Sequence, residues 1–292
     1  MTSNTSNTSN TSNSGNQGNP ISGWSFADRV NYPFVADEID GVDTESFAPR
    51  DKGYPERAWG AYWTAWRILT EFVQTDWKSI ELPPPDLSKT ADEIKKLFGL
   101  ALNERADALG EILGQANETI SYFMGLLGAS QHSHPHTYAL LNTASLTATF
   151  MAMHYKGVHR RQRPSHLAPA LMPPVEVPGH AAYPSGHSTQ AHLMAECMIA
   201  VLPDGIRGLF ATNLRALARR IARNREIGGL HYASDSAAGE TLALNIAGRF
   251  ANPDGKQDAQ VKPDGKPGSY IVIRWTPLAA LAELARQEWA DR

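Results

Sequence analysis

Apolar residues recur at helical spacing along most of this 292-residue chain. From residue 56 to residue 73, aromatic and aliphatic side chains stand three or four positions apart, which predicts a helix. Three consecutive prolines, Pro83–Pro85, stop the pattern. Thr90 followed by Glu93 has the form of a capping box, which predicts the start of the next helix. Beyond it the apolar stripe predicts one or two long amphipathic helices, whose core positions include Leu97, Leu102, Leu109, Ile112 and Leu113.

The second half of the chain continues the helical pattern. Further helices are predicted over residues 136–158, 186–202, 207–225, 232–250 and 277–290. Tyr270–Trp275 is the one segment with the pattern of a strand, and residues 252–269, rich in Gly, Pro, Asp and Lys, predict an exposed loop. The predicted fold class is therefore all-α.

The N-terminal end differs in composition from the rest. Residues 1–23 repeat Thr-Ser-Asn with few apolar side chains to bury, so we expect a disordered tail. Residues 24–51 are expected to form a strap over a single helical domain that spans residues 24–292. The chain start has neither the basic residues nor the apolar core of a secretory signal, and no apolar run approaches the roughly 20 residues of a membrane span. These features predict a soluble protein without a membrane span, either cytoplasmic or exported by a non-standard route.

Composition excludes some classes of function. A formal net charge of -3 lacks the basic excess that is typical of nucleic-acid binders, so any positive site must be local. The single cysteine, Cys197, allows no intrachain disulfide and no thiolate metal cluster. Because it lies in an apolar helical run, we expect a buried small side chain and not a nucleophile.

The first candidate block is Lys156 to Pro164. Lys156 and Arg163 are seven residues apart, about two helical turns, so both can point the same way before Pro164 ends the helix. The alternative is a solvated basic face, since three more basic residues occupy positions 159–161. By itself this block favours the alternative.

The second block, Pro184-Ser185-Gly186-His187, precedes an apolar helical run. A Ser-Gly turn at a helix start presents free N–H groups and the positive end of the helix dipole to an anion. The Ser185 hydroxyl and the Gly186 N–H can donate to an oxyanion, and His187 is placed as a proton donor. An ordinary capped helix start explains the same residues about equally well.

The third block contains Arg225, a Gly-Gly break, His231 and Asp235. On a helix, a carboxylate four residues after a histidine can accept from its imidazole, which fixes the tautomer and leaves the other nitrogen as nucleophile or metal ligand. Isolated His–Asp pairs are also common on helix surfaces. The three blocks together, and not any one of them, make chance a poor explanation.

In their order and spacing the blocks resemble the signature of a superfamily with three branches: type 2 phosphatidic acid phosphatases, bacterial class A acid phosphatases and vanadium-dependent haloperoxidases. The match covers the 80 residues from Lys156 to Asp235. Asn224 departs from the family pattern, which usually has Ser before the third-block arginine. The resemblance implies a helical bundle of the haloperoxidase and acid phosphatase type, with its catalytic core at residues 156–235.

The resemblance also implies a role for each matched residue. Lys156, Arg163 and Arg225 would neutralise the oxygens of a bound phosphate or vanadate, and Ser185 and Gly186 would donate hydrogen bonds to them.

The remaining matched residues would perform the chemistry. His231 would be the phosphate nucleophile of a phosphatase, or the axial vanadium ligand of a haloperoxidase. Asp235 would orient it, and His187 would be the acid–base partner.

Three features favour the haloperoxidase, which oxidises halide with hydrogen peroxide at a vanadate cofactor. The chain lacks the spans of lipid phosphatases and the export signal of periplasmic ones. His180, four residues before Pro184, is similar to the extra histidine of bromoperoxidases and indicates bromide. A loop histidine without a role is the alternative, and well-known haloperoxidases are longer chains.

Two other functions stay open. One is a soluble phosphomonoesterase that hydrolyses phosphate esters through a phosphohistidine at His231 and needs no cofactor. The other is a non-catalytic anion-binding protein, which predicts loss of His187 or His231, and both are present. The resemblance to this superfamily also makes a homo-oligomer a possible state of the protein. The histidines at positions 132, 134 and 136 lack zinc-site spacing and are expected to be solvated at a helix entry.

Overall fold

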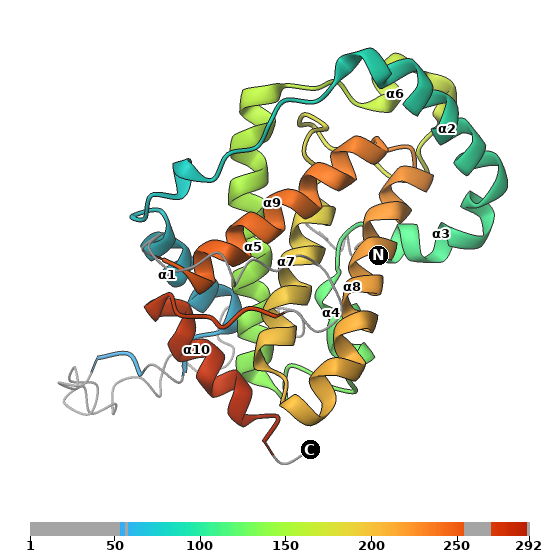
Figure 1. The fold of residues 1–292 in the computed structure, drawn as a ribbon. Helices are drawn as coiled ribbons and strands as arrows, with labels where there is room; N and C mark the ends of the chain where they lie inside the picture. The colour runs from blue at the N-terminus through green and yellow to red at the C-terminus, as the bar shows by residue number, and fades with distance from the viewer. Residues whose placement is uncertain (1–52, 56–57, 254–269, 291–292) are drawn as a thin grey trace, which may run out of the picture.

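The computed structural model describes residues 53–55, 58–253 and 270–290, and among these it is all-helical, without strands (Figure 1). This confirms the predicted fold class. The α-helices are α1 (Ala61–Phe72), α2 (Thr90–Asn103), α3 (Arg105–Gly114), α4 (Ile120–Leu126), α5 (Pro135–His159), α6 (Pro164–Leu167), α7 (Gly186–Val201), α8 (Asp204–Ile227), α9 (Ala233–Ala251) and α10 (Thr276–Gln287). The predicted tail, the strap and most of the loop at 252–269 lie outside the described residues.

Helix α7 forms the centre of the bundle. Every residue from Ser188 to Val201 is buried, because α5, α8 and α9 pack around it (Figure 1). A helix enclosed on all sides is expected to lack a separate polar face. The largely apolar sequence of this segment agrees with that expectation. α1 and α10 pack against α5, and they close the core with an aromatic cluster of Phe72, Phe250 and Trp275.

A smaller apolar cluster lies apart from the main core, beneath the end of the bundle where α2 crosses. Its buried members are Leu97, Leu171, Ala182 and Tyr232. Leu97 comes from α2, Leu171 ends the 3-10 helix η6 (Pro169–Leu171), and Tyr232 immediately precedes α9. This cluster fixes α2 against the segments that carry the second and third blocks.

Two predictions about the first half of the chain are wrong. Thr90 does not cap α2: Lys89 is the N-cap, and a short 3-10 helix, η5 (Leu87–Lys89), comes directly before it. The Glu93 side chain makes tertiary contacts instead of capping. The one or two long helices are three, α2, α3 and α4, and three of the expected core residues are exposed: Leu102, Leu109 and Leu113. These short helices pack on one side only, so a smaller part of the stripe is covered.

The predicted strand at Tyr270–Trp275 is also wrong. Ile271 and Ile273 are buried while Tyr270, Val272 and Arg274 are exposed, so the alternation is real. The segment pairs with no strand of the described part of the chain, and the N–H groups of Arg274 and Trp275 both donate to the carbonyl of Phe250 at the end of α9.

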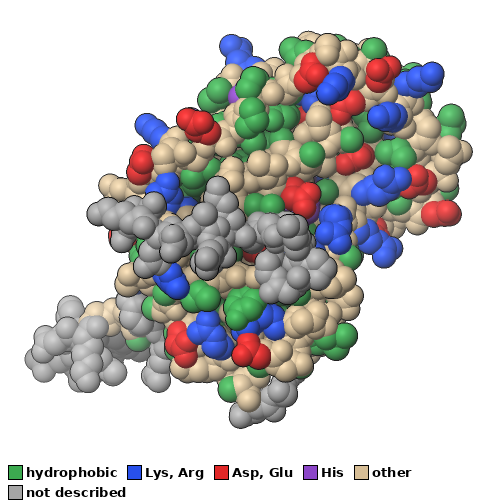
Figure 2. All heavy atoms as spheres, in the orientation of Figure 1, with side chains coloured by type: hydrophobic (Ala, Val, Ile, Leu, Met, Phe, Trp, Pro, Cys, Tyr) green, Lys and Arg blue, Asp and Glu red, His purple; other side chains and the backbone are tan. Residues whose placement is uncertain are grey.

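The exposed surface mixes both signs of charge. Figure 2 shows Lys and Arg side chains interspersed with Asp and Glu over one face, without a continuous basic patch. None of the described helices combines the length and the apolar character that crossing a membrane requires.

Candidate active site

The chain brings Lys156 and Arg163 together by changing direction between them. α5 ends at His159, and Arg160 then takes a left-handed conformation with a φ of 52°. Arg163 is the N-cap of α6, whose first residue is Pro164. The prediction that one helix runs on to Pro164 is wrong, because Pro164 begins a helix and does not end one. Both cations are nevertheless buried, at 3% and 1% exposure, so this block is not a solvated basic face.

Backbone carbonyl groups hold both cations in place. Lys156 Nζ donates to the carbonyl oxygens of residues 181 and 182, at 2.7 and 2.9 Å. Arg163 donates to the carbonyls of His180 and Leu230, each at 3.0 Å, and its Nη1 lies 3.3 Å from His231 Nε2. Neutral carbonyl dipoles orient the two cations, while Asp235, whose charge acts on both, is itself paired with Arg161.

The second block forms the start of α7, as predicted. Ser185 is its N-cap and is completely buried, and its hydroxyl accepts from Ser188 N at 3.3 Å. Ser185 N donates to the carbonyl of Asp235 at 2.9 Å, which fixes this turn to the start of α9. A Cβ built on Gly186 would meet nothing within 4 Å, so open space lies beside the turn.

His187 is half-buried behind this turn. Its Nε2 lies 3.0 Å from the carbonyl oxygen of Gln115. A carbonyl can only accept, so Nε2 carries the proton and Nδ1 is left with a lone pair. Gln115 is held in turn by Asn224, whose amide donates to its side chain at 2.9 Å and to Glu111 at 2.8 Å. The residue that departs from the family pattern thus supports the histidine from α8.

Arg225 enters the site from the last turn of α8. It is 1% exposed, and its Nη2 donates to the carbonyl of Ile112 at 2.7 Å. Its Nε is buried without a hydrogen-bond partner among the described residues. A buried donor without an acceptor costs about 1–3 kcal/mol, so this position favours an added acceptor.

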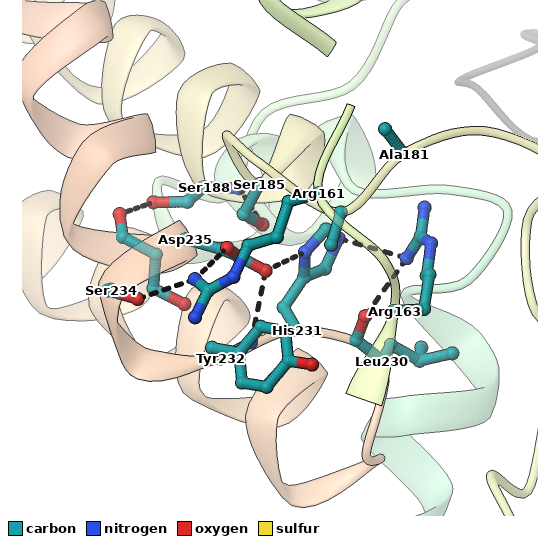
Figure 3. A network of polar contacts seen from close by, with 12 residues as sticks. Arg161, Arg163, Ala181, Ser185, Ser188, Leu230, His231, Tyr232, Ser234 and Asp235 are labelled. Atoms are coloured by element: carbon teal, nitrogen blue, oxygen red, sulfur yellow. Dashed lines mark hydrogen bonds and ion pairs between the residues drawn. The ribbon is translucent and has the colours of Figure 1, made fainter. Parts of the chain in front are cut away.

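His231 lies before α9, and Asp235 lies in its first turn. The expected His–Asp contact is present, with Nδ1 and Oδ2 3.1 Å apart, although His231 itself is not helical (Figure 3). The same Oδ2 accepts from Tyr232 N at 3.1 Å. His231 Nδ1 must therefore donate to Asp235, and Nε2 keeps its lone pair on the side of Arg163.

Two further charged residues complete the site, and the sequence did not single them out. Arg161 Nη1 donates to Asp235 Oδ1 at 2.7 Å, and its Nη2 donates to Glu93 Oε2 at 2.8 Å. Arg161 also lies over the ring of Tyr232, 3.7 Å from the centroid. Glu93 comes from α2 and accepts from the N–H of Ser234 at 2.8 Å. The only sequence signal was the position of Arg161, two residues before Arg163.

The site carries more positive than negative charge. Among the described residues, Asp235 is the one carboxylate in contact with His231, and Arg161 already pairs with this carboxylate. Burial lowers the pKa of Lys156 well below its usual value, and the charge of Arg163 lowers it further. Burial also lowers the pKa of Arg163 and of Arg225 to about 10. These shifts are the mark of desolvated cations that an anion would stabilise.

The same cations act on the histidines. Burial and the charge of Arg225, followed by those of Arg163 and Lys156, lower the pKa of His187 to about 3. Burial and the charges of Arg163 and Lys156 also lower the pKa of His231. Both rings are neutral at pH 7. These electrostatic contacts show that all three blocks converge on one place.

His180 lies at the edge of the site and lines a pocket of about 600 Å³ together with Lys156 and Arg163. Its Nδ1 lies 3.0 Å from Arg163 Nη2, which can only donate, and 3.2 Å from the carbonyl oxygen of Ala181, which can only accept. Burial and the charge of Lys156 lower its pKa to about 4. His180 therefore contacts Arg163, one of the residues expected to bind the anion.

The remaining histidines do not form a metal site. Within the described part of the chain, no group of three or more His, Cys, Asp or Glu side chains is arranged to hold a metal ion. The expectation that the histidines at the start of α5 are solvated is wrong for His134, which is 3% exposed and packs on Trp289 with ring centroids 4.2 Å apart. His136 pairs with Glu288 at 2.8 Å. Cys197 is buried, as expected, and burial raises its pKa.

No family model matches the chain, and no curated protein matches it. The fold and the site therefore define the class to which this protein belongs. It is an all-helical protein in which three buried cations and two neutral histidines surround a place suited to an anion.

Proposed function

We propose that this protein is a vanadium-dependent haloperoxidase-like enzyme, which oxidises halide with hydrogen peroxide at a vanadate held by His231. One observation carries the proposal. Lys156, Arg163 and Arg225 are buried around His187 and His231, and the one carboxylate whose charge acts on Lys156 and Arg163 is Asp235, which already pairs with Arg161. An added anion would offset the remaining positive charge, and the neutral His231 Nε2 can bind it directly.

The residues fit vanadate on three counts. The Arg225 Nε lacks an acceptor among the described residues, the space beside Gly186 is open, and Gly186 is the first residue of α7, whose N-terminal N–H groups suit an anion. Lys156, Arg163 and Arg225 would hold the oxygens, and His231 Nε2 would bind the metal. When bound, vanadate supplies the Lewis acid that activates hydrogen peroxide toward halide.

The protein's own side chains then hold and move protons. Asp235 keeps the proton on His231 Nδ1, so that Nε2 keeps its lone pair, toward which Arg163 donates. His187 is unprotonated at Nδ1 and can accept a proton from hydrogen peroxide. A bound anion offsets the charges that lower its pKa, so His187 becomes a better base once the site is filled.

His180 supports the proposed preference for bromide. Its side chain lies beside Arg163 and lines the pocket through which a halide anion would approach. The alternative is a soluble phosphomonoesterase, and one observation favours it. His231 Nε2 is an unprotonated nitrogen among three cations, which suits a nucleophile attacking phosphate as well as a metal ligand.

Two activities measured on one metal-free preparation test the choice. We expect bromination that depends on hydrogen peroxide to appear after orthovanadate is added, with little hydrolysis of p-nitrophenyl phosphate before it. Calorimetry must first show that vanadate has bound. Bound vanadate without bromination, alongside brisk hydrolysis, would favour the phosphatase. A His231→Ala variant that retained both activities would overturn the site assignment.

A further inference from the structure

The pocket beside His180 extends outward from the site. It lies between the last turns of α5, residues 160–166 and residues 177–181, and has a volume of about 600 Å³. Pockets that bind small organic molecules range from about 300 to 1,000 Å³. Since Lys156 and Arg163 form part of its wall, a molecule in this pocket lies next to the oxyanion site.

The outer wall of this pocket combines apolar and basic side chains. Met153, Val177 and Pro178 supply apolar surface, while Arg160 and His166 supply exposed basic groups. All the residues that line it belong to the described part of the chain, and none is a carboxylate. The exposed Glu176 precedes Val177 in sequence but does not line the pocket.

The carboxylates nearest in the site cannot compensate this charge. Asp235 and Glu93 both bind Arg161, which closes the inner end of the wall. The pocket therefore presents positive charge beside apolar surface. Such a wall favours an organic anion over a neutral or cationic molecule.

Arg160 has a backbone conformation that is unusual for a residue with a side chain. It is the C-cap of α5 and has a φ of 52°, a left-handed position that Gly or Asn usually occupies. Its guanidinium makes no hydrogen bond or ion pair with the described residues. A strained residue whose side chain does nothing for the fold points to a role in binding.

We propose that this pocket binds the organic part of an anionic substrate, and that Arg160 binds that substrate's own carboxylate, sulfonate or phosphate. A planar guanidinium suits such groups because it can donate two parallel hydrogen bonds. The inference rests on the proposed function only in calling the ligand a substrate. Binding itself requires neither of the two activities.

Calorimetry with two probes of the same apolar body tests the proposal. Naphthalene-2-sulfonate carries the anion and 2-naphthol lacks it. Both are titrated at saturating inorganic phosphate, so that the inner cations are already occupied. We expect the sulfonate to bind about tenfold more tightly than the naphthol, and we expect Arg160→Gln to abolish that difference. Arg219→Gln removes an equivalent exposed arginine from α8 and should retain it.

Two further variants separate binding from folding. Arg160→Gly removes the backbone strain, so it should raise the melting temperature while losing the preference for the sulfonate. Arg160→Lys keeps the charge and should retain part of the preference. Equal binding of the two probes by the unmodified protein, or a full sulfonate preference in Arg160→Gln and Arg160→Gly, would overturn the proposal.

The outcomes also distinguish this inference from the proposed function. If the protein shows the Arg160-dependent preference but neither bromination nor hydrolysis, the anion pocket is supported and the proposed function is contradicted. If the protein is active but shows no preference for the sulfonate, only the anion pocket is contradicted.

Discussion

His231 Nδ1 lies 3.1 Å from Asp235 Oδ2, and the second oxygen of the same carboxylate accepts from Arg161 at 2.7 Å. The carboxylate that sets the tautomer of His231 is therefore itself fixed by a buried cation. An ionised carboxylate only accepts, so the proton stays on Nδ1 and the lone pair on Nε2 faces Arg163. The chemistry proposed for Nε2 depends on this arrangement.

Asp235→Asn tests that dependence. The amide can donate toward Nδ1, which moves the imidazole proton to Nε2 and removes the lone pair. By analogy with the same substitution in serine protease triads, we expect kcat to fall about 10³-fold or more. Steady-state kinetics gives the loss, and ¹⁵N NMR of the His231 ring gives the tautomer. A variant that kept its proton on Nδ1 and lost less than threefold in kcat would contradict the orienting role.

Glu93→Gln tests the outer part of the network. Hydrogen bonds from Ser234 and Arg161 outweigh the effect of burial and lower the pKa of Glu93. Removing its charge leaves Arg161 with one buried partner, so we expect the free energy of unfolding to fall by about 3 kcal/mol. The matched control is Glu104→Gln, because the Glu104–Arg223 pair is exposed, with side chains 41% and 52% accessible. Its loss should stay below about 1 kcal/mol in the same urea titration.

An equal loss of unfolding free energy in the two variants would mean that the buried ion pair stabilises the fold no more than the exposed one. If Glu93 positions Arg161, its variant should also lower kcat while leaving KM for hydrogen peroxide nearly unchanged. Glu104→Gln should change neither constant.

Local sequence patterns predicted the contacts within the second and third blocks but not the charged network around them. Short spacings joined Ser185 to His187 and His231 to Asp235, and each pair lies within one turn of the chain. The Glu93–Arg161 pair joins positions 68 residues apart, across α2 and the end of α5. Thr90 offered a local partner for Glu93, and the capping box was therefore the nearer explanation. Only the packing of α2 on the smaller apolar cluster brings Glu93 to Arg161.

The helices were predictable for the same reason, and their environments were not. Periodicity gave α5, α7 and α9 to within a few residues, because burial on one or all faces leaves a pattern in the sequence. It could not say how much of each stripe a neighbour covers, so Leu102 and Leu113 were expected in the core. Nor could periodicity show that the extended segment at 270–275 has no neighbouring strand among the described residues.

The excess positive charge predicts that oxyanions stabilise the protein. Orthovanadate at 100 times its dissociation constant should raise the free energy of unfolding by about 2.7 kcal/mol, because it binds the folded chain alone. Lys156→Met should reduce that gain, since one of the three cations is lost. Urea denaturation with and without vanadate, at matched ionic strength in sodium chloride, measures both. Equal stabilisation by chloride would indicate general screening and no site.

The lowered pKa of His187 predicts a loss of stability in mild acid. Its pKa is about 3 in the folded protein and about 6.5 when unfolded, so the unfolded chain binds the proton first. Its contribution is complete above pH 6.5 and is lost as the pH falls toward 3. At pH 5 this histidine alone should cost about 2 kcal/mol.

Unfolding titrations from pH 8 to pH 4.5 measure the slope of stability against pH. His187→Gln should flatten it, and the exposed His132→Gln serves as the control outside the site. A slope unchanged by His187→Gln would contradict the assignment of this histidine as a buried neutral base.

Gly239 carries the last prediction, because it sets how closely α9 approaches the start of α7. A Cβ at this position would lie 2.7 Å from the carbonyl oxygen of Ser185 and 2.7 Å from the Ser188 Cβ. Backbone cannot give way cheaply there, so Gly239→Ala should destabilise the fold by about 1–3 kcal/mol and weaken vanadate binding by moving Ser185. Gly248→Ala lies in the same helix with nothing within 4 Å, so it should stabilise by about 0.5–1 kcal/mol. Two variants of equal stability would show that α9 does not hold the anion-binding turn in place.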